Sequence, residues 1–171
     1  MSAEQLTTER LDDLISRFGS SRIAVLGDFF LDKYLDVDPS LAETSVETGL
    51  VAHQVVGVRC SPGAAGTIVC NLASLGIGEL SAIGFTGSDG EAFELRRELT
   101  SLKCGVEHLH SDPRRRTPTY LKPRDAQTIT LGAEHSRYDT KNRDKTPESM
   151  ETQVIDSLHQ VVGEVDAVIL L

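Results

Sequence analysis

The stretch RIAVLGDFFLDKY, residues 22–34, decides how the rest of the chain is interpreted. It begins with a near-continuous apolar run that ends at Gly27 and Asp28, a pattern typical of a strand buried in a parallel sheet. In open α/β sheets, ligands bind beyond the carboxyl ends of such strands. We therefore expect Asp28, and Asp32 shortly after it, to offer carboxylate oxygens to the hydroxyl groups of a ligand. The alternative is local, because an Asp after a Gly commonly caps a turn.

Strand and helix patterns alternate along most of the chain. Expected helices carry Leu11, Leu14, Ile15 and Phe18 before Gly19; Ile68, Asn71, Leu72 and Leu75 before Gly76; Ala92, Leu95, Leu99 and Leu102 before Gly105; and Met150, Val154, Leu158 and Val161 after Thr146 and Pro147. Ser88 and Glu91 match a capping box at the start of the third helix. Further strands are expected at 79–84, 106–110 and 165–171. The alternation predicts an α/β fold with a parallel sheet and right-handed crossovers.

Two segments break this alternation. Residues near 33–60 contain short β-branched stretches separated by Pro39 and glycines, and 116–131 has the pattern of a hairpin with Pro123–Asp125 near its turn. We expect these segments, near 33–60 and 116–133, to form a small antiparallel β lid outside the main sheet.

The sequence VDAVILL at 165–171 predicts a second buried strand at the end of the chain. A buried parallel strand needs neighbours on both sides and helices over both faces. We therefore expect residues 1–171 to be the N-terminal portion of one domain whose C-terminal half is missing.

Composition restricts the class of protein. Hydrophobic residues make up 39% and charged residues 25% of the chain, as in globular proteins, and the net charge of −9 disfavours nucleic acids and anionic membranes as partners. No apolar run approaches the length of a membrane span, and the acidic N-terminus lacks the pattern of a secretory signal. Cys60, Cys70 and Cys104 are widely spaced and odd in number, which favours a reducing, cytoplasmic setting.

Four motifs in order resemble the PfkB, or ribokinase, family of carbohydrate kinases. GDFFLDKY resembles the opening strand and loop of its heptose-phosphate kinase branch, and SPGAAGTIVCNLASLG resembles the glycine-rich entry into the following helix. The third motif is IGFTGSDGEAFELRREL. The fourth consists of TPTYLKPRDAQ, which resembles the later lid strands, and HSRYDT, which carries the Arg-x-Asp pair that follows them. The resemblance extends from Arg22 through nearly the whole chain.

The resemblance implies a ribokinase-like three-layer α/β/α domain with a β lid that transfers the γ-phosphoryl group of ATP, with Mg²⁺, to a sugar hydroxyl. By position, Asp28 and Asp32 would hold substrate hydroxyls, and Gly63 and its neighbours would line the substrate floor. Lys122 and Arg124 would approach a phosphate on the substrate. The family also implies a homodimer formed through the lid.

The chain departs from the family pattern in two ways. Ala64 stands where the family has a second glycine, and Thr67 stands where it has a substrate-contacting Asn. The Thr hydroxyl cannot reproduce the paired donor and acceptor of an amide. The late Gly-Ala-Gly-Asp motif that carries the family's catalytic base is absent, and no Walker-type sequence replaces it. Phosphoryl transfer requires charge stabilisation around the transferred group, so we predict that this chain alone is not catalytic.

Other hypotheses remain open from the sequence. The changes at Ala64 and Thr67 also suit a non-catalytic sugar-binding or interaction module, whereas a dinucleotide-binding domain fits poorly because the loop after RIAVLG lacks G-x-G-x-x-G. His108 and His110 share a strand face without a third metal ligand, which favours surface histidines. Arg114–Arg116 suits either a phosphate contact or a solvated loop.

Overall fold

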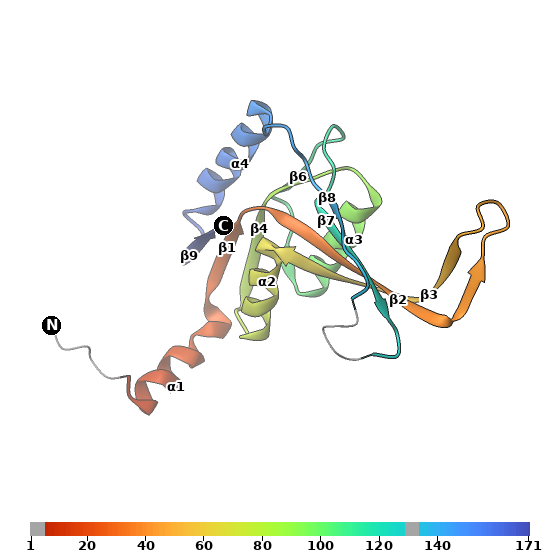
Figure 1. Cartoon of the computed structure of the whole chain (residues 1–171). Coiled ribbons are helices and arrows are strands. Elements are labelled where there is room, and N and C mark those ends of the chain that lie inside the picture. Colours follow the sequence, from red (N-terminus) through yellow and green to blue (C-terminus); the bar gives the residue numbers. More distant parts are fainter. Residues whose placement is uncertain (1–5, 129–133) are drawn as a thin grey trace.

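The computed structural model of this chain describes residues 6–128 and 134–171, which contain two separate β-sheets (Figure 1). In chain order the elements are α1 (Thr8–Ser16), η1 (Phe18–Ser20), β1 (Arg22–Leu26), β2 (Phe29–Thr44), β3 (Val51–Ala64), α2 (Ala65–Ser74), β4 (Glu79–Thr86), α3 (Gly90–Ser101), β5 (Cys104–Gly105), β6 (Leu109–Ser111), β7 (Thr119–Asp125), β8 (Tyr138–Thr140), α4 (Glu148–Val161) and β9 (Ala167–Leu170). None of the helices in these residues has the length and hydrophobicity needed to cross a bilayer.

The first sheet, the body sheet, is entirely parallel. Its strand order is β5-β4-β1-β9, and β6 pairs with β4 beyond the short β5. The central strand β1 is buried because Val25 lies opposite Ala82 on one side and Ile169 on the other. The predicted parallel α/β sheet is therefore confirmed.

Helices cover both faces of the body sheet and make three layers. On one face, Val25 packs with side chains of α2 and α3, such as Val69 and Leu95, all fully buried. On the opposite face, Ala24 and the other inward side chains pack against α4. The helix α1 buries none of its side chains and extends away from the sheet (Figure 1).

The second sheet, the lid sheet, has the strand order β3-β2-β7-β8 and projects from the body (Figure 1). Its long β2–β3 hairpin is antiparallel, as is the β7–β8 pair, but β2 and β7 run parallel. The expected small β lid is therefore present but mixed, because β2 and β7 both start at the body and run outward. The predicted segments near 33–60 and 116–133 fall in this sheet, although β2 and β3 together span 29–64, and residues 129–133 lie outside the described residues.

The start of α3 differs from the expected capping box. The helix begins at Gly90, one residue later than the box requires, so Asp89 rather than Ser88 is the N-cap residue. Its carboxylate accepts a hydrogen bond from the Ala92 amide at 3.0 Å. At the other end of α3, Lys103 takes the left-handed conformation, with φ 59°, in place of the expected Gly105.

Two other strands also differ from expectation. The strand predicted at 106–110 is shifted to Leu109–Ser111, where the Arg96 guanidinium donates to the carbonyl groups of Leu109 and His110. The last strand, β9, is half-buried to exposed rather than buried, and Leu170 is 68% exposed. Within the described residues it pairs with β1 alone, so only one of its edges is covered.

Candidate functional site

Asp28 lies at the carboxyl end of β1, as the sequence predicts. Its main-chain carbonyl accepts the Ala65 amide at 3.0 Å, which ties the end of β1 to the start of α2. Its exposed side chain lines a hollow of about 290 Å³ together with Phe30, Arg115 and Lys141. This hollow lies at the edge where the family resemblance implies the substrate.

Asp32 lies on one face of the lid sheet, which we call the inner face and define by Phe30, Asp32, Tyr34, Tyr120 and Lys122. These side chains share a face because Asp32 pairs in register with Tyr120, and Tyr34 with Lys122. The Lys122 ammonium lies 2.8 Å from Asp32 Oδ1. This short contact is an ion pair that engages the buried Oδ1 and holds Lys122 against Asp32 on the inner face.

Gly63 makes room for this carboxylate. It faces Phe30 in the neighbouring strand, and a Cβ atom at Gly63 would lie 3.0 Å from Asp32 Oδ2. That separation is shorter than a comfortable contact, so a side chain there would displace the Asp32 carboxylate. The predicted pair of Asp32 and Gly63 is therefore brought into direct contact.

Lys122 is held among aromatic rings. Its ammonium lies 5.0 Å from the centroid of Tyr34 and 5.8 Å from that of Tyr120, within the range of cation–π attraction. Burial disfavours its charge, but the ion pair with Asp32 and the contact with Tyr34 outweigh burial, so the pKa of Lys122 is raised. Lys122 is therefore charged at neutral pH.

Two more cations surround the Tyr120 ring. The Arg137 guanidinium lies 4.7 Å and the Lys141 ammonium 5.0 Å from its centroid, and both cations pair with Asp139. Arg137 and Asp139 form the Arg-x-Asp pair noted in the sequence, whereas Tyr120 and Lys141 were not singled out there. The sequence feature that could have identified them is the alternation of side chains along β7 and β8. Once the two strands pair, this alternation places Tyr120 opposite Asp139.

Arg124 lies farther out on the same face and is separated from Lys122. Its guanidinium lies 3.6 Å from Asp36 and donates to the Thr128 carbonyl at 2.6 Å. Arg59 also binds Asp36, at 3.0 Å, and its hydrogen bond lowers the pKa of that carboxyl group. Arg124 is therefore held by Asp36 and Thr128, while its buried Nε has no hydrogen-bond acceptor among the described residues.

The start of α2 carries the two residues that depart from the family pattern. Ala64 has φ 51° and ψ −118°, a conformation that L-residues rarely adopt and that glycine tolerates. No side chain caps the helix, and Thr67 is exposed in its first turn. A glycine at position 64 would suit this backbone better, which gives a conformational reason for the family's glycine there.

The other residues considered from the sequence mainly contact other parts of the chain. A ring nitrogen of His110 lies 2.8 Å from the buried Ser157 hydroxyl, so His110 joins β6 to α4. Arg114 pairs with Asp112 at 2.6 Å, and its hydrogen bonds lower the pKa of Asp112 to about 2. Arg115 donates to carbonyl groups of the loop before α4. Burial raises the pKa of the Cys70 thiol, which makes it less reactive.

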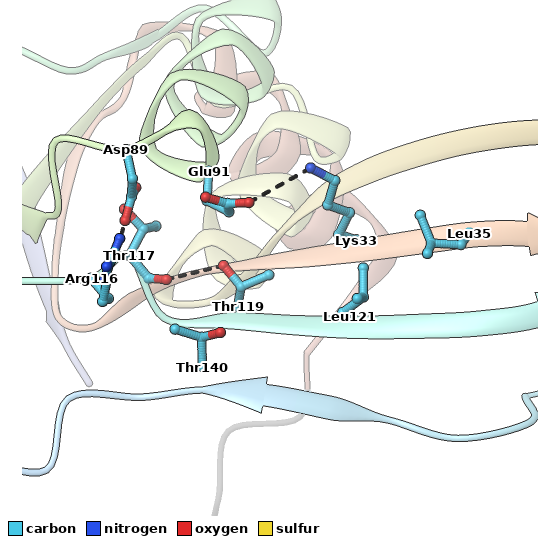
Figure 2. A pocket seen from close by; sticks show the side chains of 9 residues that line it. All are labelled: Lys33, Leu35, Asp89, Glu91, Arg116, Thr117, Thr119, Leu121 and Thr140. Carbon is cyan, nitrogen blue, oxygen red and sulfur yellow. Dashed lines mark hydrogen bonds and ion pairs between the residues drawn. The ribbon is translucent and has the colours of Figure 1, made fainter. Parts of the chain in front are cut away.

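A second cavity lies on the opposite, outer face of the lid sheet. It measures about 500 Å³, and Figure 2 shows side chains of β2, β7, β8 and the start of α3 around it. Asp89 lies on its wall but is fully engaged, since its oxygens accept from Ala92 and from the amide and hydroxyl of Thr117. The outer face is therefore distinct from the face that carries Asp32.

Comparison with known proteins places this geometry in context. No protein-family model matches the chain. It is 28% identical over 162 residues to the bifunctional protein HldE of Citrifermentans bemidjiense, covering 94% of this chain and 31% of that protein. It is 30% identical over 136 residues to the bifunctional protein HldE of Blochmanniella floridana, covering 77% of this chain and 27% of that protein. The chain thus spans about a third of the length of these curated relatives.

Solved structures show the same fold. A carbohydrate kinase from Agrobacterium tumefaciens superposes with a TM-score of 0.56 at 14% identity, covering 88% of this chain and 45% of that one. A putative sugar kinase from Clostridium perfringens gives 0.57 at 17% identity, covering 86% and 42%. The chain therefore has the ribokinase-like fold of the PfkB carbohydrate kinases.

Proposed function

We propose that this chain is the substrate-binding portion of an ATP-dependent carbohydrate kinase that phosphorylates a hydroxyl group of a sugar or sugar phosphate. The observation that supports this most is the inner face of the lid sheet, where Asp32, Gly63 and Lys122 meet beside two tyrosines. A carboxylate and an ammonium beside aromatic rings suit a polyhydroxylated ring that carries an anionic group.

In this proposal each site residue has a separate role. Asp28 and Asp32 accept substrate hydroxyls, and Gly63, Ala64 and Thr67 form the floor at the start of α2. Lys122 supplies positive charge for an anionic group on the substrate. Arg124 is the second candidate for that role, beside Asp36 and Thr128.

The residues present include no motif of the kind that would hold the nucleotide and its metal. The sequence lacks the Gly-Ala-Gly-Asp motif, and the described residues contain no cluster of three side chains suited to hold a metal ion. We therefore derive no phosphoryl-transfer step within this chain. ATP and Mg²⁺ belong to the proposal for a longer parent protein, and the isolated chain is proposed to be inactive.

Isothermal titration calorimetry tests the binding proposal with a heptose phosphate and the same heptose without phosphate. We expect the chain to bind the phosphorylated sugar and Asp32→Asn to weaken binding about 10- to 100-fold, the range for losing a hydrogen bond to a charged group. Asp156→Asn, on the exposed surface of α4, is the control and is expected to leave affinity unchanged. Equal affinity of the Asp32→Asn and parent chains would exclude the proposed role of Asp32.

The rival function is a non-catalytic sugar-binding or interaction module, supported by Ala64 and Thr67. Measurement of sugar-dependent ADP release with Mg²⁺ and ATP tests the inactivity of the isolated chain, which both hypotheses predict. Turnover by the 171-residue chain would overturn the proposed inactivity. Reading the coding sequence past Leu171 distinguishes the two hypotheses, because a Gly-Ala-Gly-Asp segment in frame favours the kinase and a stop codon favours the module.

A further inference from the structure

An ion-pair cluster joins the outer face of the lid sheet to the body. The Lys33 ammonium, on β2, lies 2.7 Å from Glu94 Oε2 and 3.8 Å from Glu91 Oε1, both on α3 (Figure 2 shows the Glu91 pair). The Lys33 side chain is 20% exposed and that of Glu94 24%, so solvent screens this contact less than it screens a surface pair.

The chain passes directly between lid and body beside this cluster. The strand β2 begins one residue after Asp28, and β3 runs without a loop into α2 at Ala64 and Ala65. Phe29 and Ala64 are partners in register, so the two strands leave the body together. Ala64 holds a left-handed φ of 51° at this junction. The strand β7 enters the lid beside them, with Thr119 in register with Leu31, so the lid sheet meets the body at one end of its strands.

The cavity on the outer face leaves room beside the cluster. It separates Leu35 and Leu121 of the lid from the first turn of α3, and its lining includes Lys33 and Glu91. Close-packed apolar contacts between the lid sheet and α3 would resist movement of one against the other. At the cavity such contacts are missing. Beyond the base of the lid, the ion pairs of Lys33 are therefore directed contacts between this face and α3, in addition to Cys60 of β3, which packs against the core.

We propose that Lys33, Glu91 and Glu94 form a latch that restrains rotation of the lid sheet about its junction at Asp28 and Ala64. Rotation of the lid toward its inner face moves β2 away from α3 and lengthens the Lys33–Glu94 contact. Asp32 precedes Lys33 in β2 and points to the opposite face, so the latch also determines where the Asp32 carboxylate lies. This inference concerns the unliganded chain and does not depend on the proposed substrate.

The charge state of the cluster is consistent with this role. The hydrogen bond to Glu94 raises the pKa of Lys33 in spite of partial burial, so the ammonium is charged at neutral pH. A second ion pair provides a matched comparison, because Arg59 and Asp36 lie 3.0 Å apart on neighbouring strands of the lid. That pair is contained within the lid sheet and does not bridge to the body.

Pulsed electron–electron double resonance measures the orientation of the lid directly. A ketone-bearing amino acid at Thr48, at the exposed tip of the β2–β3 hairpin, and another at Thr100, exposed on α3, accept nitroxide labels without changing the native cysteines. We expect Lys33→Met and Glu94→Gln each to broaden or shift the distance distribution. Lys33→Arg should retain the parent distribution, and so should Asp36→Asn.

Salt provides an independent arm of the same experiment. At 1 M salt the Debye length falls to about 3 Å, so the ion pairs are screened. The distance distribution of the parent should then approach that of Lys33→Met. The distribution of Lys33→Met itself should not change with salt. Circular dichroism confirms that each variant is folded. A parent-like distribution in both Lys33→Met and Glu94→Gln would overturn the latch, as would an equal broadening in Asp36→Asn.

Discussion

Replacement of Ala64 by glycine is expected to stabilise the protein, although glycine usually destabilises. Ala64 has φ 51° and ψ −118°, and its side chain is exposed, so removing the Cβ atom loses no packing. A non-glycine residue in a sparsely populated backbone region costs about 1–3 kcal/mol. Glycine adds conformational entropy to the unfolded chain, which offsets about 0.4–1 kcal/mol of this relief.

The expected net gain in the free energy of unfolding is therefore roughly 0.5–2 kcal/mol, which corresponds to a rise of about 2–4 °C in Tm per kcal/mol for a chain of this size. Urea unfolding followed by circular dichroism measures it. The control is Ala126→Gly, at an exposed alanine that is not among the residues with positive φ, where we expect a loss of about 0.4–1 kcal/mol. A decrease in stability for Ala64→Gly equal to that of the control would refute the argument from backbone strain.

Three further predictions follow from burial and charge. Because the pKa of Asp112 is lowered to about 2, below its unfolded value of about 4, its contribution to stability is present above about pH 4 and lost as the pH falls toward 2. Urea unfolding from pH 7 to pH 2 should therefore show a smaller loss of stability in Asp112→Asn than in the parent, and equal pH dependence would contradict this. Burial raises the pKa of Cys104 to about 12, so mass spectrometry after iodoacetamide treatment at pH 8 should find this thiol unmodified until urea unfolds the chain; alkylation in the folded protein would show that burial does not protect it. Exposed valines on β3, Val56 and Val58 among them, support the proposed homodimer through the lid, so sedimentation equilibrium should show a dimer that a Val56→Thr, Val58→Thr variant weakens, and a monomeric parent would exclude it.

The polar site was only partly predictable. Asp32, Gly63 and Lys122 were singled out from motifs, and the structure brings them into contact. Tyr120 and Lys141 were missed because their positions around one ring depend on the pairing of β7 with β8. Arg124 was expected near a phosphate, but its engagement by Asp36 and Thr128 depends on neighbours distant in sequence.

Sequence by itself determined the alternating body sheet, because continuous apolar runs such as Ile23–Leu26 alternate along the chain with helical patterns, and both patterns are local properties. It also placed Asp28 and Asp32 in order after the first strand. Tertiary structure alone decided that β2 and β7 run parallel, that Lys33 meets Glu94 of α3 and that Asp32 meets Lys122 of β7. The same holds for the left-handed backbone at Ala64. The direction of a strand, the partners of its side chains and the backbone geometry at the junction arise from contacts between residues far apart in the chain. No local pattern of hydrophobicity encodes them.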